Sequence, residues 1–159
     1  MPEPGASPAY SLRPATADDF PFLYDLHVAT MRDYVTQTWG WDDAAQREMF
    51  AASFQPANSQ IITINGLDIG VLAVEHRPDD WFLANFEIAP VAQGQGLGAT
   101  IIRDLLATAA RDGLPARFQV LKVNPARRLY ERLGFAITGE TPTHYLMSAT
   151  PIVHTGEGG

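Results

Sequence analysis

The chain has 159 residues, which is close to the size of one domain and long enough to bury a core without disulfides or a structural metal. It contains no cysteine, which excludes a disulfide scaffold and a thiolate nucleophile, and its four histidines lack paired ligand spacing, so no metal is expected. The net charge of −7 disfavours nucleic-acid partners and suits a cationic one.

The first half of the chain predicts a strand, two helices and three strands. Thr16 and Asp19 are typical of a capping box at a helix start. Asp42 is placed to cap a second helix after the interruption at 39–41. Asn65-Gly66 between two apolar runs predicts a tight hairpin. The predicted elements are a strand at 10–13, helices at about 17–38 and 43–54, and strands at 60–64, 69–75 and 81–89. The first helix carries Phe22, Leu23, Leu26, His27 and Thr30 at helical spacing.

The second half predicts helices that alternate with strands. Gly113 and Gly134 stand where a left-handed residue closes a helix, and Pro125 is expected at the first position of the short helix. The predicted elements are helices at 98–112 and 125–133 and strands at 117–123, 135–139 and 144–148. A run of strands followed by alternation predicts an α/β protein with a mixed sheet and helices on its faces.

Both ends of the chain are rich in proline and glycine, so we expect a disordered N-terminal tail at 1–9 and a flexible C-terminal tail at 149–159. Between them, residues 10–148 show no linker or repeat, which predicts a single domain. No stretch reaches the ~18 apolar residues of a membrane span, and the N-terminus lacks the pattern of a signal peptide. A cytoplasmic protein with no membrane partner is expected.

A glycine-rich turn, Gln93-Gly-Gln-Gly96-Leu-Gly98, lies between a predicted strand and a predicted helix. Alternating glycines let the backbone approach a ligand, and a helix N-terminus offers N–H groups to pyrophosphate. A plain strand-to-helix turn is the alternative. The lysine of a P-loop is missing, and the glycine spacing, roughly ninety residues into the chain, does not fit a dinucleotide-binding turn.

This turn matches the pyrophosphate loop Q/R-x-x-G-x-G/A of the GCN5-related N-acetyltransferase (GNAT) family. A second motif follows with Asn124, Ala126, Tyr130 and Gly134-Phe135, although the spacing from Asn124 to Ala126 is one residue shorter than in the family. From Tyr10 to Met147 the chain therefore resembles this family. The resemblance implies a GNAT fold: a mixed, mostly antiparallel sheet of about six or seven strands with helices on both faces.

The same resemblance implies acetyl-CoA as the cofactor, bound in the cleft between two splayed central strands at 81–89 and 117–123. Backbone groups of Ile88 and Val91 would pair with the pantetheine arm, and N–H groups from 93 to 99 would hold the pyrophosphate. Asn124 would bind the arm or order the strand end, or merely cap the helix. The expected cofactor-binding residues are Ile88, Val91, Gln93, Gly94, Gln95, Gly96, Leu97, Gly98, Ala99, Asn124, Ala126 and Tyr130.

Two residues are the catalytic candidates. Tyr130 would donate a proton or hydrogen bond to the departing CoA sulfur, or would only pack its ring as a half-buried helix residue. Glu87 would act as the general base, and strand alternation places it on one face with Asn85; a solvated strand glutamate is the alternative. His144 and Tyr145 are rival candidates for the base.

Aromatic residues beside carboxylates predict the acceptor side, where ring faces and charge suit a cationic amine. The expected substrate-binding residues are Tyr34, Trp39, Trp41, Asn85, His144 and Tyr145. Alternatively, both tryptophans pack in the core while Asp42 and Asp43 cap the helix.

The predicted function is transfer of an acetyl group from acetyl-CoA to a primary amine of a small molecule or peptide, expected to be cationic, by direct attack in a ternary complex. A non-catalytic acyl-CoA-binding or sensor module on the same fold is the alternative. An acetyltransferase acting on charged tRNA is disfavoured by the acidic balance. The resemblance also allows a homodimer. The sequence names neither the acceptor nor the length of the acyl group.

Overall fold

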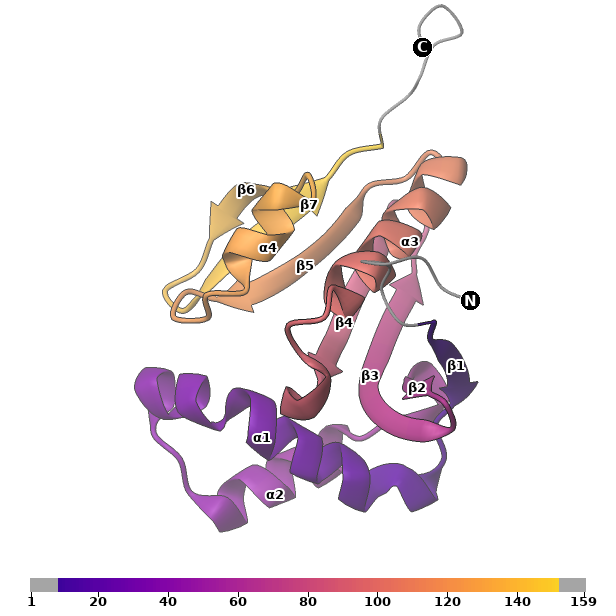
Figure 1. Ribbon diagram of the computed structural model, residues 1–159. Coiled ribbons are helices and arrows are strands. Elements are labelled where there is room, and N and C mark those ends of the chain that lie inside the picture. Colours follow the sequence, from indigo (N-terminus) through magenta and orange to yellow (C-terminus); the bar gives the residue numbers. More distant parts are fainter. Residues whose placement is uncertain (1–8, 152–159) are drawn as a thin grey trace, which may run out of the picture. The chain divides into compact units, whose positions relative to one another are not determined.

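The computed structural model describes residues 9–151 (Figure 1), so the predicted tails lie outside the described residues, apart from their innermost positions. The described chain divides into two compact units. The first comprises the residues up to Val74 together with Ala84–Gly98, and the second comprises Glu75–Leu83 together with the residues from Ala99 onward. The single domain over 10–148 stays a prediction.

Within residues 9–151, the strands form a seven-stranded sheet in the order β1-β2-β3-β4-β5-β7-β6. The strands are β1 Ser11–Pro14, β2 Gln60–Ile64, β3 Leu67–His76, β4 Trp81–Ile88, β5 Ala116–Leu121, β6 Ala136–Glu140 and β7 His144–Ala149. The pairs β1–β2, β2–β3, β5–β7 and β6–β7 are antiparallel, whereas β4 and β5 pair in parallel. The sheet is therefore mixed and mostly antiparallel, as predicted.

In the first unit, local signals define two helices, α1 Phe20–Trp39 and α2 Asp43–Ser53. The Thr16 N–H donates to Asp19 Oδ2 at 2.8 Å. This bond is part of the predicted capping box, which begins a short 3-10 turn, Ala17–Asp19, that leads into α1. Asp42 Oδ1 accepts from the Ala45 N–H at 2.8 Å, which confirms the predicted cap of α2.

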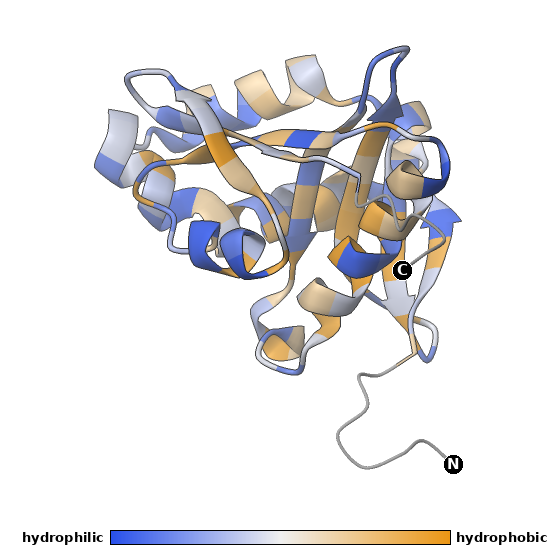
Figure 2. Ribbon diagram, turned by 90° about the horizontal axis from the view of Figure 1, so that it is seen from above, coloured by the Kyte–Doolittle hydropathy of each residue, from blue (hydrophilic) through white to orange (hydrophobic). Residues whose placement is uncertain are grey.

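The hairpin between β2 and β3 confirms the Asn65-Gly66 prediction. Both residues have positive φ, 52° and 80°, as a two-residue turn that matches the strand twist requires. The strands then place Ile61 and Val71 in a core with Leu23 and Leu26 of α1. In Figure 2 hydrophobic segments run along the strands, and hydrophilic segments recur along the helices.

Two helices follow in the second half of the chain: α3 Leu97–Arg111, closed by Gly113 at φ 71°, and α4 Arg127–Arg132, closed by Gly134 at φ 110°. Helix α4 begins two residues later than predicted, so the prediction that Pro125 occupies its first position is wrong. The N–H groups of Arg128 and Leu129 donate three residues back, to Pro125 and Ala126, and this tight turn precedes the α-helix.

Strand ends also differ slightly from the predictions. β5 stops at Leu121 because its carbonyl accepts the Asn124 N–H in a turn. β4 stops at Ile88, since Pro90 opens the short 3-10 turn η3, Pro90–Ala92. Ala149, predicted as the first residue of the C-terminal tail, pairs with Ala116 as the last residue of β7.

No helix within residues 9–151 has the length and apolar character needed to span a bilayer.

Candidate active site

The glycine-rich turn takes a conformation that side chains rarely adopt. Gly94 and Gly96 have φ of 80° and 81°, while Gly98 already lies in α3. A Cβ atom at Gly94 would meet nothing within 4 Å, so its backbone angle rather than crowding favours glycine there. The turn from Gln93 to Gly96 is exposed, so a ligand can approach its backbone.

Gln93 holds the turn to the end of β4. Its side-chain Nε2 donates to the Ile88 carbonyl at 2.8 Å, and its backbone N–H donates to the Pro90 carbonyl at 3.2 Å. The N–H groups of Gln93 are therefore already bonded, and an anion at the turn would meet the N–H groups beyond it. The N–H groups of Leu97–Ala99 belong to the first turn of α3, where no partner exists within the helix and the dipole favours an anion. These residues fit a pyrophosphate group.

Glu87 is buried, with 8% of its surface exposed, so the alternative of a solvated strand glutamate is wrong. Its Oε2 lies 3.4 Å from Nδ1 of His27 in α1. Asn85 is half-buried two residues earlier in β4, on the same face by strand alternation. A buried carboxylate in this position is chemically suited to take a proton from a ligand.

Tyr130 of α4 is buried, with 7% of its surface exposed. It is therefore more deeply buried than the alternative of a half-buried helix residue predicted. Its ring centroid lies 4.2 Å from that of Phe118 and 5.8 Å from that of Phe135. This burial raises the pKa of the Tyr130 hydroxyl. The hydroxyl therefore keeps its proton at neutral pH and is available as a hydrogen-bond donor.

Asn124 has a local structural task. Its Oδ1 accepts the Ala126 N–H at 2.9 Å, just before α4. The alternative that Asn124 caps the helix is wrong, because Ala126 is the N-cap residue of α4 and the Asn124 bond stabilises the turn before it. A ligand would be bound through the amide nitrogen of Asn124.

His144 and Tyr145 begin β7 in surroundings that do not favour binding of a cation. The Lys122 ammonium and the Arg127 guanidinium lie 5.4 Å and 5.3 Å from the centre of the Tyr145 ring. Nδ1 of His144 lies 2.8 Å from Thr143 Oγ1, and burial lowers the pKa of His144, which keeps its imidazole neutral at neutral pH. Both cations are paired with carboxylates, Lys122 with Glu140 and Arg127 with Glu131, each at 3.2 Å, so the Tyr145 ring already has cationic neighbours in place of an acceptor.

The tryptophans are not core residues, so the alternative that both pack in the core is wrong. Trp39 is 61% exposed at the end of α1. Trp41 is half-buried, its ring centre lies 6.1 Å from that of His27 and 5.7 Å from the Arg32 guanidinium, and its Nε1–H donates to Asp43.

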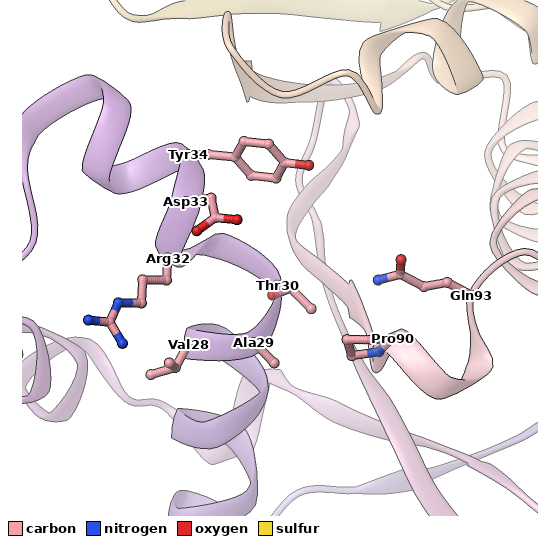
Figure 3. Close-up of a pocket in the computed structure, with 8 residues that line it drawn as sticks. All are labelled: Val28, Ala29, Thr30, Arg32, Asp33, Tyr34, Pro90 and Gln93. Atoms are coloured by element: carbon pink, nitrogen blue, oxygen red, sulfur yellow. The ribbon is translucent and has the colours of Figure 1, made fainter.

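A cavity of about 240 Å³ lies between α1 and the segment that follows β4 (Figure 3). Its lining residues are Val28, Ala29, Thr30, Arg32, Asp33 and Tyr34 from α1 and Pro90 and Gln93 from the turn. The Tyr34 ring reaches across the cavity toward Gln93 (Figure 3). Tyr34, predicted to bind the acceptor, and Gln93, predicted to bind the cofactor, therefore line the same cavity within the first unit.

The predicted site residues divide between the two units. The predicted site residues of the first unit are Tyr34, Trp39, Trp41, Asn85, Glu87, Ile88, Val91 and 93–98. Those of the second unit are Ala99, Asn124, Ala126, Tyr130, His144 and Tyr145. Val91 is 84% exposed. His27, Thr30 and Asp33 were not among the site residues predicted from the sequence. His27 and Thr30 stood on the predicted inner face of the first helix, and a titratable residue on that face was the available signal.

A sequence model of the acetyltransferase (GNAT) family matches residues 20–135. The chain therefore belongs to this family of enzymes, whose acetyl donor is acetyl-CoA. The predicted family, class of enzyme, fold class and cofactor are confirmed at this level.

Solved structures agree on the fold. A PaiA N-acetyltransferase from Thermoplasma acidophilum, solved with coenzyme A, is 11% identical with a TM-score of 0.72, over 89% of this chain and 99% of that one. The ribosomal-protein-S18-alanine N-acetyltransferase of Escherichia coli is 19% identical with a TM-score of 0.65, over 92% and 97%. A histone acetyltransferase HPA2-related protein from Corynebacterium glutamicum is 20% identical with a TM-score of 0.66, over 94% and 99%.

Proposed function

We propose that this acetyltransferase moves the acetyl group of acetyl-CoA to a primary amine of a small molecule or peptide, by direct attack in a ternary complex. The observation that carries the proposal is Glu87, a buried carboxylate in the same compact unit as the glycine turn. A family member that only binds acyl-CoA has no need for a buried base at this place.

The turn and the start of α3 hold the cofactor. Acetyl-CoA supplies the acetyl group as a reactive thioester. The N–H groups of Gly94 and Leu97–Ala99 bind its pyrophosphate, because backbone donors are oriented before the ligand arrives. Ile88 and Val91, at the end of β4 and in η3, contribute backbone groups to the arm.

Glu87 prepares the acceptor. A free alkylamine has a pKa of ~10, so it is mostly charged at neutral pH and cannot attack until it loses a proton. The Glu87 carboxylate takes that proton, directly or through a water molecule. The amine nitrogen then forms a bond to the acetyl carbon, the bond from that carbon to sulfur breaks, and the nitrogen loses its second proton, which ends on the departing CoA sulfur.

Tyr130 assists the departure of the sulfur. Burial keeps its hydroxyl protonated, so the hydroxyl donates a hydrogen bond to the departing sulfur and relays to it the proton that the attacking nitrogen loses. Asn124 binds the pantetheine through its amide nitrogen. Both roles follow the family motif that these two residues match.

A cationic acceptor is supported by charge. The overall charge is −7, and Asp33, Asp42 and Asp43 lie at the end of α1 and the start of α2. The names of two similar structures, one acting on a ribosomal protein and one on histones, support a peptide amine as one acceptor class. Cytoplasmic location and a homodimer stay predictions.

The test is release of CoA thiol from acetyl-CoA with a panel of primary amines: a linear polyamine, an arylalkylamine and short peptides with free N-termini. We expect thiol release that matches the mass-spectrometric yield of acetylated amine for at least one class. Calorimetric binding of acetyl-CoA without release across the panel would instead support a non-catalytic acyl-CoA-binding module.

A further inference from the structure

His27 of α1 and Glu87 of β4 contact each other although they are far apart in the chain. Nδ1 of His27 lies 3.4 Å from Glu87 Oε2. The exposed fraction is 20% for the His27 side chain and 7% for the Glu87 side chain. Burying a carboxylate is energetically costly unless it has a polar partner, and His27 provides one for Glu87.

The imidazole of His27 is held in place by aromatic neighbours. Its centroid lies 5.3 Å from the ring of Phe50 in α2 and 6.1 Å from that of Trp41. The nearby charged groups Arg32 and Asp43 contact the Trp41 side chain. Both ring contacts are tilted, with interplanar angles of 32°, and Nδ1 is the ring atom that lies near Glu87.

The neighbouring strand β3 positions the backbone around Glu87, separately from the His27 contact. A Cβ atom at Gly70 would come within 2.5 Å of the Glu87 carbonyl oxygen, so the two strands approach as closely as glycine allows. The Ala89 N–H donates to the Ile69 carbonyl at 2.8 Å. The backbone at Glu87 thus lies close against Gly70 of β3, and its carboxylate contacts His27.

We propose that His27 is a positioning residue for Glu87: its Nδ1–H donates to Oε2 and leaves Oε1 to take the proton from the acceptor amine. This inference rests on the proposed role of Glu87 as the base. The distance of 3.4 Å is long for a charge-assisted bond, and such contacts tighten when substrates bind.

Two substitutions separate hydrogen bonding from packing. His27→Phe keeps a flat ring but removes the donor, whereas His27→Asn places an amide N–H near the position of Nδ1. Tyr24→Phe, one turn earlier on α1 and packed on Phe20 and Phe50, is the matched control.

With the most reactive amine of the panel, we expect His27→Phe to lower kcat by about tenfold to a hundredfold, as small misplacements of catalytic groups do. The KM for acetyl-CoA should not change. His27→Asn should recover most of kcat, and Tyr24→Phe should match the wild-type enzyme.

A readout without substrate uses ¹⁵N NMR of the histidine rings in the wild-type protein. We expect the His27 proton on Nδ1 at neutral pH, and loss of that preference in Glu87→Ala. A proton on Nε2 alone in the wild-type protein would overturn the inference, because Nδ1 could then donate nothing to Glu87.

The kinetic outcomes distinguish this inference from the function on which it rests. If Glu87→Gln loses activity while His27→Phe behaves like Tyr24→Phe, only the role of His27 is overturned. If Glu87→Gln keeps the wild-type rate and pH profile, the proposed base is overturned as well.

Discussion

Glu87 in one compact unit and Tyr130 in the other are buried to nearly the same degree, 8% and 7% exposed, but their surroundings differ. Glu87 faces a nitrogen of His27. Tyr130 lies among the rings of Phe118 and Phe135, with no charged partner among the causes of its pKa shift.

The difference shows how burial produces two opposite catalytic tasks. The Glu87 carboxylate has a polar partner, the imidazole of His27. Apolar rings penalise the charged phenolate, which keeps the hydroxyl protonated and able to donate. The proposed base and the proposed hydrogen-bond donor thus belong to different compact units of the chain.

The largest effect is expected from Gly96→Asp, which tests whether the glycine turn of the first unit binds the cofactor. The substitution puts a side chain at φ 81° and a negative charge beside the proposed pyrophosphate site. We expect no measurable acetyl-CoA binding by calorimetry.

Gly66→Asp, in the β2–β3 hairpin at φ 80°, is the control for backbone strain, which alone costs roughly 1–2 kcal/mol. It should bind acetyl-CoA normally. Normal binding by Gly96→Asp as well would remove the pyrophosphate from this turn.

Glu87→Gln should lower kcat at neutral pH by about a hundredfold or more, which is the usual contribution of a general base. The amide fills the same space but cannot take a proton. Steady-state kinetics with saturating acetyl-CoA measures the effect, and Glu48→Gln, an exposed change on α2, should have none. A kcat within twofold of the wild-type value would assign the base elsewhere.

Tyr130→Phe should lower kcat less, by about tenfold, because a thiol with a pKa of ~8.5 leaves readily even without a donor. The ring packing on Phe118 is kept, so the Kd for acetyl-CoA should barely change. Unchanged turnover would leave Tyr130 with a packing role alone.

The smallest effect concerns stability of the second unit. Asp80 is 3% exposed and bonded to Arg77 at 2.6 Å and Arg117 at 3.2 Å, and the Arg77 bond lowers its pKa below the usual 3.8. Asp80→Asn should reduce the free energy of unfolding at neutral pH by about 1–3 kcal/mol.

Because the pKa of Asp80 is lower in the folded state, its stabilisation is present above pH 3.8 and is lost as the pH falls through the lowered value. Denaturant unfolding should therefore show a smaller difference between variant and wild type in strong acid. Asp79→Asn, an exposed neighbour, is the control. An equal difference at both pH values would show that the charge of Asp80 does not stabilise the fold.

Local signals in the sequence predicted most of the fold. The caps at Thr16 and Asp42, the Asn65-Gly66 hairpin and the glycine turn each depend on residues a few positions apart. The start of α4 was misplaced because Pro125 also suits the tight turn that precedes the helix. Such boundaries depend on small energy differences.

The contacts that give the site its chemistry were not predictable in the same way. His27 and Glu87 are 60 residues apart in the sequence, and neither residue indicates the other. The same holds for the approach of Gly70 to the Glu87 backbone and for the cluster of Phe118 and Phe135 around Tyr130. Tertiary packing decides which titratable groups are buried and beside what.

The most direct test of the contrast between the two groups is the pH dependence of kcat/KM for the wild-type, Glu87→Gln and Tyr130→Phe enzymes, measured with the same amine. We expect Glu87→Gln to lower the rate and to flatten the acidic limb, whereas Tyr130→Phe should lower the rate and keep that limb. An acidic limb unchanged in Glu87→Gln, or lost in Tyr130→Phe, would contradict the assignment of base and acid.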